Sequence, residues 1–306
     1  MIRIFFLLIL SIFPDILIAQ VPKHLSELFA YRKSTPFAFQ LKDSEKFKNV
    51  VVQTININND KLQKIEAYLI EPRSEGKYPV VIFQHGGEND NDYFLQEAKE
   101  LSRKGIICLL IEAPWLRPVY KNNMLWGNTS QFYRQGIIDI QRSIDFLSTL
   151  PKVDTSRIAF TGHSYGAQLG GILAGIEPRI KAYVLMSGTA ELTSLLKETN
   201  HPRINIIRDS IPLDFNNWLK QMEPLNPIHY IRHSKSPVFF QFAANDEYDI
   251  DEIEVKKYVA AAPLTEHVRF YNSGHKMINK RAEEDRTKWI VQKLKKQEPP
   301  ESSIKQ

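Results

Sequence analysis

A serine with a glycine two residues before it and another two residues after it constrains this chain most. The pentapeptide Gly162–Gly166 (GHSYG) follows an apolar run at 158–160 and precedes a helix-compatible stretch at 167–173. This context is typical of a nucleophile elbow, a sharp strained turn that exposes a serine hydroxyl. The two glycines allow the strand and the helix to approach closely. The pattern therefore predicts Ser164 as a catalytic nucleophile.

Short apolar runs alternate with helical patterns along most of the chain. Strands are predicted at 50–57, 64–70, 78–83, 106–111, 158–160, 180–186, 237–242 and 267–271, and helices at 92–104, 131–150, 167–173, 251–261 and 276–294. Asn58-Asn59-Asp60 predicts a hairpin between the first two strands. Residues 21–48 have weak periodicity, and we expect an extension that packs on the domain. The alternation implies an α/β fold: a mostly parallel sheet with helices on both faces and an antiparallel N-terminal hairpin.

We expect one domain over 20–294, because no repeat or low-complexity linker interrupts it. Residues 190–236 separate the sixth and seventh predicted strands and are far longer than a usual connection. This length predicts an inserted cap or lid, although an ordinary helix with a long ordered loop also fits. The polar tail at 295–306 contains two adjacent prolines, and we expect it to be disordered.

The first 19 residues have the pattern of a secretory signal. Arg3 supplies the charged start, and residues 4–13 form the apolar core. Leu17-Ile18-Ala19 is a plausible cleavage site, although a small residue is more usual than leucine at its first position. Pro14 and Asp15 interrupt the apolar run well short of the ~20 residues that a membrane span needs. We therefore expect a secreted or periplasmic protein without stable membrane insertion after cleavage.

Composition excludes several classes of function. Among 306 residues the net charge is +5, and the Lys and Arg residues are scattered, which argues against nucleic acid as a partner. Cys108 lies in an apolar run, which predicts a buried core thiol. The sequence has no HExxH motif, no paired Cys/His cluster and no phosphate-binding loop, so we expect neither a catalytic metal nor a cofactor.

A serine nucleophile needs a base and an orienting acid. In parallel sheets the reactive groups follow the carboxyl ends of strands. Asp246 follows the predicted strand at 237–242 and is the best candidate acid, ahead of Asp249 and then Glu247. His275 follows the last predicted strand, directly after a glycine that permits a tight turn. The resulting order Ser…Asp…His is that of α/β-hydrolases.

The oxyanion of the tetrahedral intermediate needs two backbone N–H groups. Tyr165 supplies one, because it directly follows the nucleophile. Gly87, with Gly86 as the alternative, supplies the second from the turn after the strand at 78–83. We expect structural roles for His85 and His163, which would connect neighbouring loops.

Aromatic residues follow the strand at 106–111 and recur in the long insertion. Trp115 and Trp126 lie in the first group and Trp218 in the second. They are candidates for lining an apolar or sugar-binding pocket. Packing anchors for long loops would have the same composition.

Over about residues 50–294 the chain resembles the α/β-hydrolase superfamily, in particular dienelactone-hydrolase-like esterases and prolyl-oligopeptidase-type peptidases. The resemblance rests on the motifs His85-Gly86-Gly87, Gly162–Gly166, Leu225-Asn-Pro-Ile228, Asn245-Asp246 and Gly274-His275. It departs at Ala167, where these groups often have glycine. The resemblance implies a serine hydrolase that acts on small-molecule or carbohydrate-linked esters. A peptidase, and a hydrolase-fold binding protein with a dormant site, remain alternatives.

Overall fold

The computed structural model describes residues 19–295, except 60, 62, 88–89, 121–126, 212–213, 249 and 251. These residues form one nine-stranded sheet in the order β1-β2-β3-β5-β4-β6-β7-β8-β9. The strands are β1 (Phe39–Lys46), β2 (Val50–Asn58), β3 (Lys64–Pro72), β4 (Tyr78–Gln84), β5 (Ile107–Ile111), β6 (Val153–His163), β7 (Ile180–Met186), β8 (Val238–Ala243) and β9 (Thr265–Tyr271).

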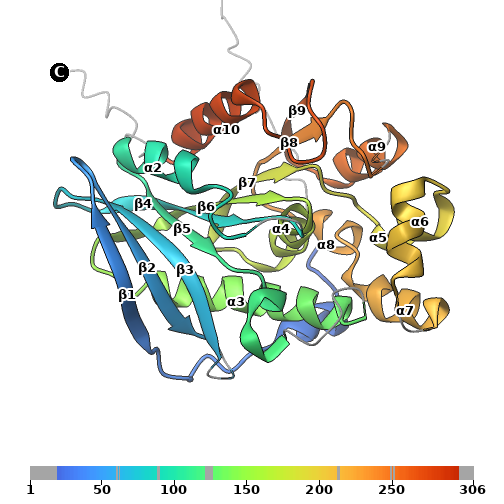
Figure 1. Ribbon diagram of the computed structural model, residues 1–306, viewed down its shortest axis with the longest axis horizontal. Coiled ribbons are helices and arrows are strands. Elements are labelled where there is room, and N and C mark those ends of the chain that lie inside the picture. Colours follow the sequence, from blue (N-terminus) through green and yellow to red (C-terminus); the bar gives the residue numbers. More distant parts are fainter. Residues whose placement is uncertain are drawn as a thin grey trace, which may run out of the picture.

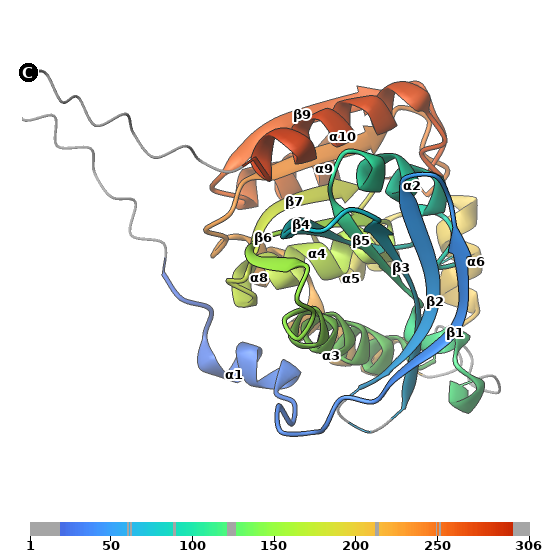
Figure 2. The same cartoon turned by 90° about the vertical axis from the view of Figure 1, so that its left-hand side faces the viewer.

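The sheet has an antiparallel end and a parallel remainder. β1, β2 and β3 pair antiparallel, as does β3 with β5. The pairs from β5 through β4, β6, β7 and β8 to β9 are parallel. Figure 2 shows the antiparallel strands curving away from the rest. The predicted mostly parallel sheet with an antiparallel N-terminal edge is confirmed.

Helices cover both faces of the sheet, as Figures 1 and 2 show. One face carries α2 (Leu95–Arg103) and α10 (Lys280–Lys293), whose apolar side chains pack with those of the central strands. The other face carries α3 (Thr129–Leu147), α4 (Tyr165–Ile176) and α9 (Glu252–Ala261), which share a larger apolar cluster. This helix–sheet–helix arrangement buries β4, β5, β7 and β8 on both faces, which explains their continuous apolar runs.

Residues 21–48 pack on the domain, as expected, and they also contain a strand that was not predicted. That segment contains α1 (Lys23–Ser26), a 3-10 turn at Glu27–Phe29 and an edge strand that pairs with β2. Every residue of β1 is solvent-exposed. An edge strand exposed on both sides buries no alternate residues, so its sequence lacks the period-two pattern that marks a half-buried strand.

Between β7 and β8 the chain forms a group of short helices. They are α5 (Leu192–Glu198), α6 (Pro202–Asp209), α7 (Phe215–Met222), a 3-10 turn (Glu223–Leu225) and α8 (Ile228–Ile231). In Figure 1, α5, α6 and α7 lie beyond the ends of the central strands. The assignment of 190–236 as a separate cap stays a prediction, as do the signal segment and the tail, most of which lie outside the described residues.

A buried ion pair fixes the loop that follows β5. The guanidinium of Arg117 contacts the carboxylate of Asp139 on α3, and both side chains are almost fully buried. Its Nε also donates to Glu112 at 3.3 Å. Buried charges of this kind are retained when they are paired and hydrogen-bonded. The pair therefore holds the loop that carries Trp115 against α3.

Two further features bear on the sequence expectations. Cys108 is fully buried within β5, as its apolar surroundings predict. No helix among the described residues is long and apolar enough to span a membrane.

Candidate active site

Ser164 occupies a strained turn between β6 and α4. Its φ of 53° and ψ of −111° lie where residues other than glycine are rarely found, and its N–H donates to the carbonyl of Met186 at 2.8 Å. A Cβ on Gly162 would lie 2.2 Å from the carbonyl oxygen of Gly166, and one on Gly166 would lie 2.1 Å from that of Gln84. Both glycines are therefore required for the close packing of this turn.

Three side chains form a continuous chain of hydrogen bonds at the carboxyl edge of the sheet. Oγ of Ser164 lies 2.8 Å from Nε2 of His275. Nδ1 of His275 lies 2.9 and 2.8 Å from the two carboxylate oxygens of Asp246. Because a carboxylate accepts, Nδ1 carries the proton and Nε2 is free to accept from the serine hydroxyl. The structure thus brings together the predicted nucleophile, base and acid.

Of the other two candidate acids, Glu247 and Asp249, the structure describes Glu247. The carboxylate of Glu247 accepts the backbone N–H of His275 at 2.5 Å, and this bond lowers the pKa of Glu247. A Cβ on Gly274 would lie 2.4 Å from Oε1 of Glu247, so glycine there makes room for the carboxylate. Glu247 therefore fixes the loop that carries the histidine and leaves Nδ1 to Asp246. Asp249 lies outside the described residues.

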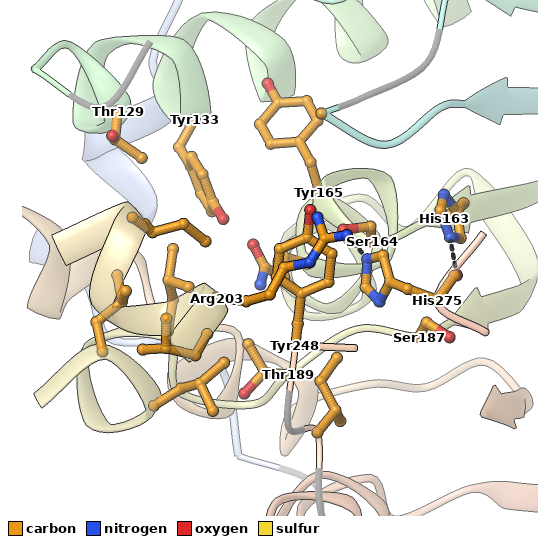
Figure 3. A pocket seen from close by; sticks show the side chains of 18 of the residues that line it. Thr129, Tyr133, His163, Ser164, Tyr165, Ser187, Thr189, Arg203, Tyr248 and His275 are labelled. Atoms are coloured by element: carbon orange, nitrogen blue, oxygen red, sulfur yellow. Dashed lines mark hydrogen bonds between the residues drawn. The ribbon is translucent and has the colours of Figure 1, made fainter. Parts of the chain in front are cut away.

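His163 supports the same loop through a hydrogen bond to its backbone. Its Nε2 lies 2.7 Å from the carbonyl oxygen of His275, as the dashed line in Figure 3 marks. Burial lowers the pKa of His163 to about 3, so the ring is neutral at neutral pH and its Nε2–H donates. His85 similarly connects loops, since its Nε2 accepts the backbone N–H of Ala113 at 3.1 Å.

The groups predicted to bind the oxyanion lie next to the serine. Tyr165 is the first residue of α4, where backbone N–H groups have no partner within the helix. Gly87 lines the cavity in front of Ser164. The alternative, Gly86, is buried, and a Cβ there would lie 3.1 Å from Cβ of Ser164. The choice between the two glycines stays a prediction.

A cavity of about 380 Å³ opens beside Ser164 and His275. Most of its walls are apolar, and its cationic lining residues are Arg203 and Lys276. None of the described residues that line it is Asp or Glu. In Figure 3 the guanidinium of Arg203 points toward Ser164, and it stacks over the ring of Tyr248 at 5.4 Å.

The three tryptophans that were predicted to bind substrate differ in their position relative to the cavity. Trp115 lines the cavity and packs edge-to-face on Tyr165, with ring centroids 4.6 Å apart. Trp218 is not among the lining residues: it is buried, and its indole N–H donates to the hydroxyl of Thr129, which does line the cavity. The prediction that Trp218 binds substrate is therefore corrected. Trp218 packs behind Thr129, a residue of the cavity lining. Trp126 lies outside the described residues.

Several lining residues were not candidates from the sequence. They are Phe132 and Tyr133 on α3, Leu192, Leu195 and Leu196 on α5, Ile204, Ile206 and Ile207 on α6, and Arg203, Tyr248 and Ile250. The apolar residues of α5 and α6 recur at helical spacing, which identifies an amphipathic face. The spacing says nothing about which cavity that face adjoins, because this depends on how the short helices turn.

Comparison with known proteins agrees with this geometry. Residues 140–245 match the family model described as BAAT / acyl-CoA thioester hydrolase C terminal. The chain is 23% identical over 213 residues to acetyl esterase Axe7A of Xylanibacter ruminicola, covering 63% of this chain and 48% of that protein. It is 25% identical over 191 residues to the putative hydrolase YtaP of Bacillus subtilis, covering 55% of this chain and 63% of that protein.

Solved structures share the fold. An acetyl xylan esterase from Paenibacillus sp. R4 superimposes with a TM-score of 0.70 at 19% identity, covering 88% of this chain and 91% of that one. The nine-stranded sheet, the elbow after β6 and the order of the three polar residues agree with the likeness. The chain therefore has the α/β-hydrolase fold, and the proteins that it resembles are named as esterases and hydrolases.

Proposed function

We propose that this chain hydrolyses carboxylic esters through an acyl-enzyme on Ser164. The observation that carries the proposal is the unbroken chain of hydrogen bonds from Ser164 through His275 to Asp246, at the base of an apolar cavity. A serine hydroxyl is a weak nucleophile at neutral pH, and a hydrogen-bonded neutral imidazole activates it.

Each half of the proposed reaction uses the same three residues. Oγ of Ser164 attacks the ester carbonyl while Nε2 of His275 takes its proton, and Asp246 stabilises the imidazolium that forms. The negative charge on the former carbonyl oxygen is held by N–H groups, for which Tyr165 and Gly87 are the candidates. Nε2 then protonates the departing alcohol. Water attacks the acyl-enzyme in the same way and releases the carboxylic acid.

The substrate class follows from relatives and from the cavity. The named relatives include an acetyl esterase and an acetyl xylan esterase, which supports small-molecule or carbohydrate-linked esters as substrates. A peptidase that grips a substrate amine needs a carboxylate, and the described lining residues contain none. A dormant binding protein would have no need for the strained turn at Ser164, a conformation that is costly to maintain.

Two substrate sets test this function. Purified protein is assayed with p-nitrophenyl acetate and butyrate, and with aminoacyl p-nitroanilides of matched size. We expect ester turnover that Ser164→Ala abolishes and little anilide turnover. Preferential cleavage of the anilides would instead establish a peptidase, and no turnover of either set would favour the binding protein.

We also propose export, supported by the sequence pattern at 1–19. N-terminal sequencing of protein recovered from the periplasm or medium of a bacterial host tests it. A mature N-terminus near Gln20 is the expected result, and a cytoplasmic protein that begins at Met1 would contradict export.

A further inference from the structure

The cavity beside Ser164 is larger than an acetyl group requires. Its volume is about 380 Å³, whereas a water molecule in the liquid takes about 30 Å³. Because a methyl group is close to water in size, the cavity has room for roughly ten such groups. An acetyl group supplies only two carbon atoms, so the cavity has room for a larger part of a substrate.

Three helices supply apolar walls to this space. Phe132 comes from α3, Leu195 and Leu196 from α5, and Ile204 and Ile207 from α6. We call this set the apolar lobe. Water has few hydrogen-bond partners against such walls, whereas a hydrocarbon chain loses nothing by leaving water. Each methylene buried there strengthens binding by about two- to fourfold.

The position of His275 decides which part of an ester reaches the lobe. His275 must protonate the departing alcohol, so the alcohol lies on the side of Ser164 that faces the imidazole. In Figure 3, Thr129 and Tyr133 lie on the opposite side of Ser164, together with the side chains drawn on α5 and α6. The acyl group therefore extends toward these helices.

We propose that the apolar lobe binds the acyl chain and selects acyl groups of about eight carbons over acetyl groups. This inference rests on the proposed ester hydrolase and names its acyl specificity. It also separates this chain from two of the proteins named above, which are an acetyl esterase and an acetyl xylan esterase by name. α5 and α6 are then the elements that determine chain length.

A pair of isomeric esters tests which end of the substrate enters the lobe. Methyl octanoate and heptyl acetate have the same formula and nearly the same hydrophobicity, but place the long chain on opposite sides of the carbonyl. We expect kcat/KM for methyl octanoate to be at least about tenfold higher, because only its long chain can enter the lobe. Equal values, or a preference for heptyl acetate, would overturn the proposal.

Filling the lobe tests the residues themselves. Leu196→Trp and Ile207→Trp each place a large ring in it, and we expect each to lower the ratio of octanoate to acetate turnover at least about tenfold. Lys197→Trp is the matched control, because Lys197 neighbours Leu196 on α5 but is exposed and does not line the cavity. It should keep the wild-type ratio. An unchanged ratio in both filling variants would overturn the assignment.

A small fluorophosphonate that reacts with activated serines distinguishes a failure of the apolar-lobe proposal from a failure of the proposed ester hydrolase. It is applied to every variant, and its reaction reports that the protein is folded and Ser164 is active. Labelling and acetate hydrolysis without any chain-length preference would refute the apolar lobe alone. Absence of both labelling and ester turnover in the wild type would refute the ester hydrolase as well.

Discussion

Asp246 presents both carboxylate oxygens to Nδ1 of His275, at 2.9 and 2.8 Å. The two residues lie 29 positions apart and follow adjacent parallel strands, β8 and β9. The carboxylate holds the imidazole in the tautomer whose Nε2 accepts from Ser164, and it compensates the charge that forms during attack.

The first prediction follows from that tautomer. Asp246→Asn should lower kcat for p-nitrophenyl acetate by about 10³- to 10⁴-fold, because an amide can donate to Nδ1 and favour the wrong tautomer. Asp249→Asn, at the second candidate acid, serves as the control and should stay within a few-fold of wild type. If Asp249→Asn abolished turnover while Asp246→Asn spared it, the acid would be wrongly assigned.

Glu247 and Gly274 should behave as one unit. Glu247→Ala removes the acceptor for the backbone N–H of His275, and we expect kcat to fall about five- to tenfold. Gly274→Ala should have the same effect, because its Cβ would displace the carboxylate of Glu247. The double variant should be no worse than either single one. Multiplied losses would show that the two residues act independently.

Gly166 in the elbow and Gly87 in the turn after β4 should differ in how well they tolerate substitution by alanine. Gly166→Ala sets a Cβ against the backbone carbonyl of Gln84, and we expect the free energy of unfolding to fall by about 3 kcal/mol or more. A Cβ on Gly87 meets nothing within 4 Å, so Gly87→Ala should change stability by less than about 0.5 kcal/mol. Urea denaturation measures both. Equal destabilisation would contradict the packing of this turn.

Burial of neutral His163 predicts a loss of stability in acid. Its pKa is lowered to about 3 in the folded protein, against about 6.5 in the unfolded chain. Between these values the unfolded state binds the extra proton, so stability falls as the pH falls. Relative to His163→Gln, the wild type should lose about 1.7 kcal/mol between pH 6.5 and pH 5.0 in urea denaturation. Parallel pH dependence of the two proteins would contradict a neutral buried His163.

The sequence predicts the parts of the fold and site whose physical cause is local. The buried strands that precede Ser164 and Asp246 show as apolar runs, and Ser164, Asp246 and His275 each lie within a few residues of the end of a strand. β1 could not be predicted, because an exposed edge strand has no burial pattern. The apolar lobe could not be predicted either, since it depends on the relative orientation of α3, α5 and α6. The role of Glu247 could not be predicted either. Its carboxylate accepts a hydrogen bond from a backbone N–H, and no residue pattern indicates such a bond.

Covalent labelling of Ser164 tests the central claim most directly. The purified protein is treated with a fluorophosphonate, and intact-mass and peptide mass spectrometry locate the adduct. We predict one adduct on Ser164, complete loss of esterase activity in step with labelling, and no adduct in Ser164→Ala. An unlabelled wild type, an adduct on another residue, or a Ser164→Ala variant that still hydrolyses esters would contradict a serine hydrolase acting through Ser164.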